Sequence, residues 1–320
     1  MILLISSKYD ITSLNVSRWL SKLKADFFSL NTEDFNSLNS FSLLDNDINV
    51  KINGVDFSDV DTVWHRRGRL RHIPKELNGL GSYSEYLKKE EDALIKSIEL
   101  YLKSSTNYIG SYIKEVENYK LYNLIKAKEA GLKIPKTLVT TSKSELLDFI
   151  NNRTAISKDI RYSVNIRTQS KYISSIGTFI VQRDDLELLE DNFAPILVQE
   201  LIQKEFEIRV FFFDNTFYAM AIFSQDDEKT KLDYRNYNEE KQNRCVPFIL
   251  PNRIKNKLIA FAKKVNIRTG SIDIIYTTSG EYIFLEVNPM GQLDWVSKNC
   301  NYHIEKNIAN NLFKSRNERN

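Results

Sequence analysis

The chain has too few cysteines and histidines to suggest a disulfide framework or a structural zinc site. Its 320 residues include two cysteines, Cys245 and Cys300, which form no CxxC pair, and three histidines. Disulfide-rich proteins and zinc sites both depend on several such residues at short spacings. The sequence therefore favours neither kind of site.

Long hydrophobic runs and an excess of one sign of charge are also missing. No stretch approaches the length of a membrane-spanning helix, and the apolar start at Ile2 to Ile5 is far too short for a signal-peptide core. The 45 basic and 42 acidic residues leave a net charge of +3, so we expect neither nucleic acid nor a membrane as a partner. We expect a soluble, cytoplasmic protein.

The chain does contain a mixed pattern of helices and strands, typical of an α/β protein of two or three domains. A strand at 2–5, a helix at 13–23 and a strand at 61–64 predict a small N-terminal unit with a parallel sheet. The other predicted helices are 85–103, 120–130, 143–151, 252–265 and 302–313. The other predicted strands are 137–140, 155–158, 196–199, 206–213, 217–224, 270–276 and 282–287.

The strongest chemical signal is the segment FLEVNPMGQ, which ends the last predicted strand. Glu286 and Asn288 are two positions apart on that strand, so their side chains point to the same face. The apolar neighbours Leu285 and Val287 are expected on the opposite face. The strand therefore presents a carboxylate and an amide oxygen together.

A second carboxylate is expected beside them. The turn TTSG at 277–280 makes the preceding strand an antiparallel neighbour, which places Asp273 next to Glu286 and Asn288. Oxygen ligands of this kind suit Mg²⁺ when phosphates supply the rest of its shell. The alternative is a pair of exposed strand carboxylates, but unpaired carboxylates within apolar strands are costly.

A third signal is an apolar strand, 196–199, that runs into the sequence Gln-Glu-Leu-Ile. Such a segment is typical of a hinge whose backbone meets an adenine edge. Lys204 and Glu207 follow closely and are candidates for the purine amino group and the ribose hydroxyls. Taken alone, the segment is better explained as an ordinary buried strand that leads into a charged surface hairpin.

Two lysines complete the set. Lys120 opens a predicted helix and Lys158 ends the strand AISK, and lysines that converge on a polyphosphate are a common arrangement. Single lysines are more often solvated surface residues. Because the chain has no P-loop and no GxGxxG motif after a strand, any nucleotide site must belong to another architecture.

The order and spacing of these features resemble the ATP-grasp superfamily over about residues 116–295. The resemblance implies an ATP-grasp fold of mixed α/β class. It places an N-terminal pre-ATP-grasp α/β domain at 1–115, a central subdomain at 116–200 and a C-terminal subdomain with the magnesium site at 201–320. Within the superfamily, the chain resembles the ribosomal S6 modification type and its peptide-crosslinking relatives.

Two local motifs resemble particular branches of those relatives. Val63–Gly68, VWHRRG, is similar to the VWYRR element of microviridin-type peptide ligases, with His65 where tyrosine is usual. The tail Val296–Ala309 is similar to the VSxPCNYYLEKxIA pattern of the grasp-with-spasm peptide maturases, with Asn299 and His303 as departures. Both motifs favour the graspetide branch.

The resemblance also implies a role for each matching residue. It assigns Lys120 and Lys158 to the ATP phosphates, Gln199, Glu200, Leu201 and Ile202 to adenine, Lys204 to the purine, Glu207 to ribose, Asp273, Glu286 and Asn288 to Mg²⁺, and Arg209 and Arg235 to the transferring phosphate. Asp233-Tyr-Arg235 is similar to the DWR element of the family. Asp233, Arg66 and Arg67 are candidate substrate contacts, although the two arginines read equally as structural salt-bridge partners.

The implied reaction activates a carboxylate as an acyl phosphate with ATP and Mg²⁺. A hydroxyl or amine then displaces the phosphate, and in the resembled branch both groups are side chains of one precursor peptide. The expected partners are such a peptide, with a leader and an acidic, threonine-rich core, and a second copy of the chain in a homodimer. One alternative is a ligase for a free amino acid or another small nucleophile. Another is a nucleotide-binding module without turnover, which the joint presence of Lys158, Asp273, Glu286 and Asn288 argues against.

Overall fold

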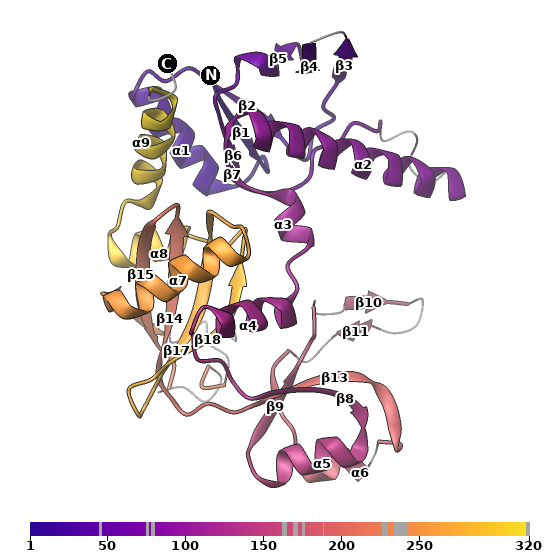
Figure 1. Ribbon diagram of the computed structural model, residues 1–320, viewed down its shortest axis with the longest axis vertical. Helices are drawn as coiled ribbons and strands as arrows, with labels where there is room; N and C mark the ends of the chain where they lie inside the picture. Colours follow the sequence, from indigo (N-terminus) through magenta and orange to yellow (C-terminus); the bar gives the residue numbers. More distant parts are fainter. Residues whose placement is uncertain are drawn as a thin grey trace.

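The structure is a computed structural model, and it describes residues 1–44, 47–74, 77, 81–161, 165–168, 172–174, 177–187, 189–225, 230–232 and 242–317. Three sheet-based units follow one another along the long axis of the molecule (Figure 1). The fold is mixed α/β, as the sequence predicts. In the part of the chain that is described, no helix is long and apolar enough to cross a membrane.

The N-terminal unit is built on a parallel sheet with the strand order β2-β1-β6-β7. The predicted parallel sheet is thus confirmed, because β1 is fully buried and pairs with β2 and β6 on either side. The antiparallel sheet β3-β4-β5 is an addition that the sequence analysis did not predict. The elements are β1 (Ile2–Ser6), α1 (Ile11–Lys22), β2 (Phe27–Asn31), β3 (Leu38–Leu44), β4 (Asp47–Ile52), β5 (Val55–Asp56), the 3-10 turn η1 (Phe57–Asp59), β6 (Thr62–His65), α2 (Ser82–Ser105), β7 (Asn107–Gly110) and α3 (Tyr112–Val116).

A second, smaller unit contains an antiparallel sheet with the strand order β12-β9-β13-β8. Helix α5 begins where β8 ends, and Leu146 of this helix packs with Leu186 and Val198 in a small core. The elements are β8 (Thr137–Ser142), α5 (Lys143–Asn151), β9 (Ala155–Lys158), β10 (Asn165–Arg167), β11 (Tyr172–Ser174), β12 (Phe179–Ile180), α6 (Arg183–Glu187) and β13 (Asn192–Glu200).

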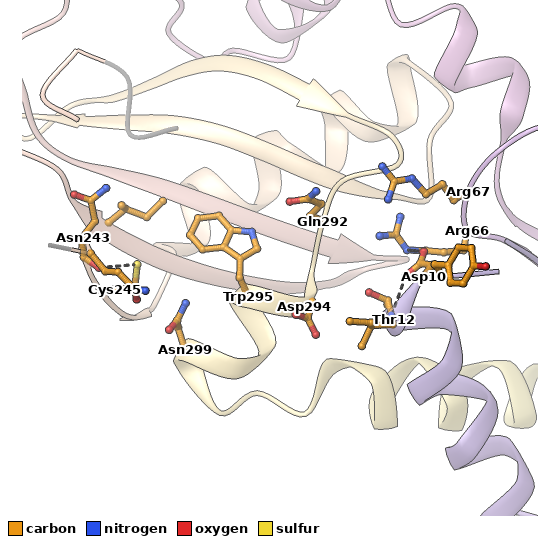
Figure 2. Close-up of a pocket in the computed structure, with 14 residues that line it drawn as sticks. Asp10, Thr12, Arg66, Arg67, Asn243, Cys245, Gln292, Asp294, Trp295 and Asn299 are labelled. Atoms are coloured by element: carbon orange, nitrogen blue, oxygen red, sulfur yellow. Dashed lines mark hydrogen bonds and ion pairs between the residues drawn. The ribbon is translucent and has the colours of Figure 1, made fainter. Parts of the chain in front are cut away.

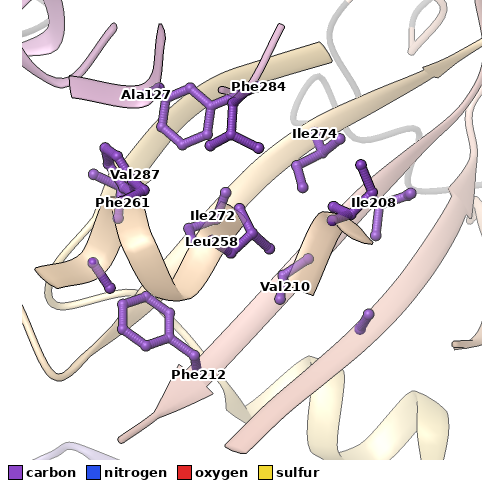
Figure 3. Packing of buried hydrophobic residues seen from close by; sticks show 14 of the residues in the cluster. Ala127, Ile208, Val210, Phe212, Leu258, Phe261, Ile272, Ile274, Phe284 and Val287 are labelled. Carbon is purple, nitrogen blue, oxygen red and sulfur yellow. The ribbon is translucent and has the colours of Figure 1, made fainter. Parts of the chain in front are cut away.

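The third unit is a five-stranded antiparallel sheet with the order β16-β15-β14-β17-β18. Helices α4 and α7 cover one face, where Phe212, Phe261 and Phe284 are among the fully buried side chains (Figure 3). The opposite face carries the polar residues described below. The elements are α4 (Lys120–Glu129), β14 (Lys204–Phe213), β15 (Thr216–Phe223), β16 (Arg244–Phe248), α7 (Asn252–Lys264), β17 (Thr269–Thr277) and β18 (Tyr282–Asn288).

The C-terminal tail forms two helices, α8 (Asp294–Cys300), which the sequence did not predict, and α9 (Ile304–Asn317), which confirms the helix predicted at 302–313 with a start two residues later. Asn301 and His303 between them have positive φ angles of 52°, a left-handed conformation that cannot continue a helix. Helix α9 returns to pack on α1 in the N-terminal unit (Figure 1). The domain boundaries predicted from the sequence stay a prediction.

A buried histidine in the N-terminal unit gives a pH-dependent stability. His65 lies between the Tyr108 hydroxyl and the Gly68 carbonyl oxygen, at 2.8 Å from each, and burial lowers its pKa below the usual value. His65 therefore binds a proton more readily in the unfolded chain than in the folded protein. Its contribution to the free energy of unfolding is fully present above about pH 6.5 and is lost as the pH falls below that value. We expect urea unfolding between pH 8 and 5 to show that the free energy of unfolding falls more steeply with falling pH in the wild type than in His65→Gln. An equal pH dependence in the two proteins would contradict this account.

Candidate active site

A cavity of about 560 Å³ lies between the small sheet and the five-stranded sheet. It is walled by β9, the end of β13, β14, β17 and β18, which come from both ATP-grasp subdomains implied by the sequence. Nine of the residues selected from the sequence line it, namely Lys158, Gln199, Glu200, Leu201, Ile202, Lys204, Glu207, Asp273 and Glu286. Residues scattered over more than a hundred positions of sequence thus meet at one site.

A β-bulge sets the direction of the acidic side chains. Asp273 on β17 pairs directly with Glu286 on β18, and the register shifts between Asp273 and Ile274. Phe284 and Val287 both enter the apolar core, whereas Leu285 and Glu286 both line the cavity. The prediction that Leu285 faces away from Glu286 is therefore wrong, because the bulge interrupts the alternation of the strand.

Each of the two carboxylates faces a cation. Nη1 of Arg209 lies 2.8 Å from both carboxylate oxygens of Asp273, and both side chains are about one tenth exposed. Nζ of Lys120 lies 3.8 Å from Oε2 of Glu286 and donates a hydrogen bond to the Asp159 carbonyl oxygen at 2.9 Å. Each of the two carboxylates thus lies beside a basic side chain.

The third predicted metal ligand, Asn288, lies at the end of β18, opposite Ser271. Its Oδ1 accepts a hydrogen bond from the Met290 backbone at 3.0 Å and so shapes the turn after the strand. Among the described residues, no three His, Cys, Asp or Glu side chains gather in a group that could hold a metal. Two adjacent carboxylates suit a cation that takes its remaining ligands from phosphates and water.

The opposite end of the cavity offers a place for a purine. Its walls include Ile156, Leu201 and Ile275, and the Ile202 N–H has no hydrogen-bond partner within the described residues. The buried Oε1 of Gln199 likewise has no partner there, while its amide nitrogen donates to Thr137 at 2.9 Å. A donor and an acceptor without partners beside apolar walls are what an adenine edge needs.

The Lys204–Glu207 ion pair lies next to this end of the cavity. Lys204 donates to Glu207, and both side chains are less than one tenth exposed. Among the lining residues that sequence reasoning did not select, four are polar, namely Thr178, Gln203, Gln225 and Lys231. They lie outside the strands or at their margins, where no periodicity or motif marks them.

The candidate substrate residues fall into different settings. Arg66 is buried, with Nε 3.2 Å from Oδ2 of Asp10 and Nη1 donating to the Met290 carbonyl oxygen at 2.9 Å. It therefore ties the N-terminal unit to the loop after β18. Arg67 is exposed and lines a second cavity of about 560 Å³ (Figure 2). Asp233 and Arg235 lie outside the described residues.

The cavity is large enough for a nucleotide and lies between two antiparallel sheets, with paired acids and lysines at one end. This arrangement is typical of α/β proteins that bind a nucleotide between two subdomains. The family description that matches the chain is the RimK-like ATP-grasp domain, over residues 96–312. The chain belongs to this family, and the ATP-grasp fold predicted from the sequence is confirmed. No curated protein matches the chain significantly.

Several solved structures share the fold over nearly the whole chain. A Chryseobacterium gregarium RiPP-associated ATP-grasp ligase in complex with ADP and a leader and core peptide is 24% identical, with a TM-score of 0.84 over 97% of this chain and 96% of that one. Macrocyclase MdnC from Microcystis aeruginosa, bound with precursor peptide MdnA, is 24% identical, with a TM-score of 0.78 over 98% and 100%. ATP-grasp ligase PsnB, complexed with minimal precursor, Mg and ADP, is 19% identical, with a TM-score of 0.76 over 98% and 96%.

Proposed function

We propose that this protein uses ATP and Mg²⁺ to form ester or amide crosslinks between side chains of a ribosomally made precursor peptide. The observation that carries the proposal is the facing pair Asp273 and Glu286 at one end of a nucleotide-sized cavity. The ATP-grasp family membership supports an ATP-dependent carboxylate ligase. The similar structures that contain a precursor peptide support a peptide as the substrate.

The residues at the site fit a magnesium–nucleotide complex. Asp273 and Glu286 would supply two carboxylates to Mg²⁺, with Asn288 as the expected amide ligand, and phosphate oxygens would complete its shell. When bound, the cation offsets the negative charge that builds up between a carboxylate and a phosphate. Lys158 lines the cavity and Lys120 lies beside Glu286, so both are placed for phosphate oxygens.

The reaction proceeds in two displacements. An oxygen of the peptide carboxylate attacks the γ-phosphorus of ATP, which releases ADP and leaves an acyl phosphate. A serine or threonine hydroxyl, or a lysine amine, attacks the acyl carbon, inorganic phosphate leaves, and a proton goes to solvent. Arg209 and, as a prediction, Arg235 offset the charge of the transferring phosphate. Each crosslink removes one water from the peptide.

Three parts of the proposal concern partners and setting. The peptide would carry a leader for recognition and an acidic, threonine-rich core as the reacting segment. A homodimer is expected, and static light scattering of the purified protein would test it. A cytoplasmic location is expected because the reaction consumes ATP.

Mass spectrometry of a candidate precursor tests the function directly. The peptide encoded next to this chain is incubated with the protein, ATP and Mg²⁺, and we expect one water to be lost for each crosslink. The loss should disappear when the core aspartates and glutamates are replaced by alanine. If a free amino acid is added to the peptide or to a small carboxylate instead, the alternative small-molecule ligase is correct. ADP release without any product would point to neither.

A further inference from the structure

A basic cavity of about 620 Å³ lies at the carboxyl ends of β1, β2 and β6 in the N-terminal unit. We call it the arginine trough, and its charged lining residues are Glu33, Arg67, Arg69, Arg71, Lys88 and Glu91. Three of its arginines come from one short stretch, RRGRLR, directly after β6. Crevices at the carboxyl ends of parallel strands are where α/β folds bind ligands.

One of the four cations is already neutralised. Nη2 of Arg69 lies 2.9 Å from Oε2 of Glu91, and this ion pair is largely buried. The other oxygen of Glu91 accepts the backbone N–H groups of His72 and Ile73 at 2.5 and 2.8 Å. Arg69 and Glu91 therefore form the fixed floor of the trough rather than a contact for a ligand.

The remaining cations are open to a ligand. The side chains of Arg67, Arg71 and Lys88 are exposed and make no hydrogen bond or ion pair with the residues that the structure describes. The backbone beneath them is ordered, because the Arg71 carbonyl oxygen accepts the Asn36 N–H at 2.7 Å. Glu33 is the carboxylate that faces them, and it accepts a hydrogen bond from Ser7 at 2.7 Å. The trough thus presents an excess of positive charge on a fixed frame.

Arg67 connects the trough to the cavity shown in Figure 2. It lines both, and from Arg67 the second cavity extends past Gln292, which follows the end of β18 closely, to Trp295. Burial raises the pKa of the Glu115 carboxyl above its usual value, and the nearby charge of Arg67 offsets part of that rise. A chain that leaves the trough past Arg67 would therefore run toward the loop that follows the paired acids Asp273 and Glu286.

We propose that the arginine trough binds an acidic segment of the peptide substrate and that Arg67, Arg71 and Lys88 hold its carboxylates. This inference rests on the proposed function, since it names where the peptide lies relative to the ATP site. Guanidinium groups pair with carboxylates through two parallel hydrogen bonds, which favours Asp and Glu side chains. A peptide rather than a nucleic acid is the proposed occupant, because a peptide is the substrate under the proposed function.

Fluorescence anisotropy with labelled octaglutamate and octaglutamine tests this site on the full-length protein. We expect octaglutamate to bind at low salt, to weaken as salt is raised, and to bind at least about tenfold more tightly than octaglutamine. The double variant Arg71→Gln with Lys88→Gln should lose about tenfold in octaglutamate affinity. Lys89→Gln is the matched control, because Lys89 is exposed on the same helix and lines neither cavity. It should bind as the wild type does.

Binding of ADP with Mg²⁺ is measured on every variant as a check on the fold and on the ATP site. Octaglutamate affinity that is equal in the double variant and the wild type would overturn the inference, as would failure of the wild type to bind. Tighter binding of a DNA oligonucleotide of equal charge would also overturn it. If no precursor is crosslinked but octaglutamate binding still depends on Arg71 and Lys88, the proposed function is wrong and the anion-binding site remains supported.

Discussion

Replacing Glu286 by glutamine is expected to lower kcat by at least about a hundredfold. The substitution keeps the shape of the side chain but removes the charge that would hold Mg²⁺ across from Asp273. About one quarter of the side chain is exposed and it lies outside the apolar core, so the fold should persist. Single-turnover rates of ADP formation with peptide, together with thermal unfolding, measure both effects.

Glu281→Gln is the control for this prediction. Glu281 lies at the other end of the same β-hairpin and pairs with Lys133 in an exposed ion pair. Its loss should leave kcat and the magnesium dependence of ADP binding unchanged, because exposed pairs contribute little. Wild-type turnover of Glu286→Gln at ordinary magnesium concentrations would remove Glu286 from the metal site.

The sequence predicts the pairing at the site because that pairing is local. A four-residue turn joins β17 to β18, so Asp273 must lie near Glu286, and β17 and β18 are antiparallel as expected. The alternation of apolar and polar residues likewise locates β14, since its inward side chains build the main core. The superfamily follows from the order of the motifs, and the family match confirms it.

What the sequence could not predict depends on contacts between distant segments. The bulge that turns both Leu285 and Glu286 toward the cavity leaves no mark on the apolar pattern. The pairing of Arg66 with Asp10 joins residues far apart in the sequence. The sequence alone therefore left open whether Arg66 contacts substrate or forms a structural salt bridge. The sheet β3-β4-β5 was missed because much of it is exposed, which removes the alternation that identifies a strand.

The pairing of Arg209 with Asp273 leads to the second large prediction. Both residues are buried, and removal of one partner from a buried ion pair costs about 3–5 kcal/mol. We expect Arg209→Gln to lower the free energy of unfolding by this amount in urea without magnesium. The exposed ion pair of Lys133 with Glu281 provides the comparison, because Lys133→Gln should cost less than about 1 kcal/mol.

Magnesium distinguishes a metal site from a purely structural ion pair. In the wild type, Arg209 occupies both oxygens of Asp273, so a cation must compete with it. Arg209→Gln removes this competitor, while Asp273 still faces Glu286 across the two strands. Added Mg²⁺ should therefore raise the free energy of unfolding more in Arg209→Gln than in the wild type, since a ligand that binds the folded state stabilises it. An equal effect of Mg²⁺ on Arg209→Gln, Lys133→Gln and the wild type would show that Asp273 is not a metal ligand.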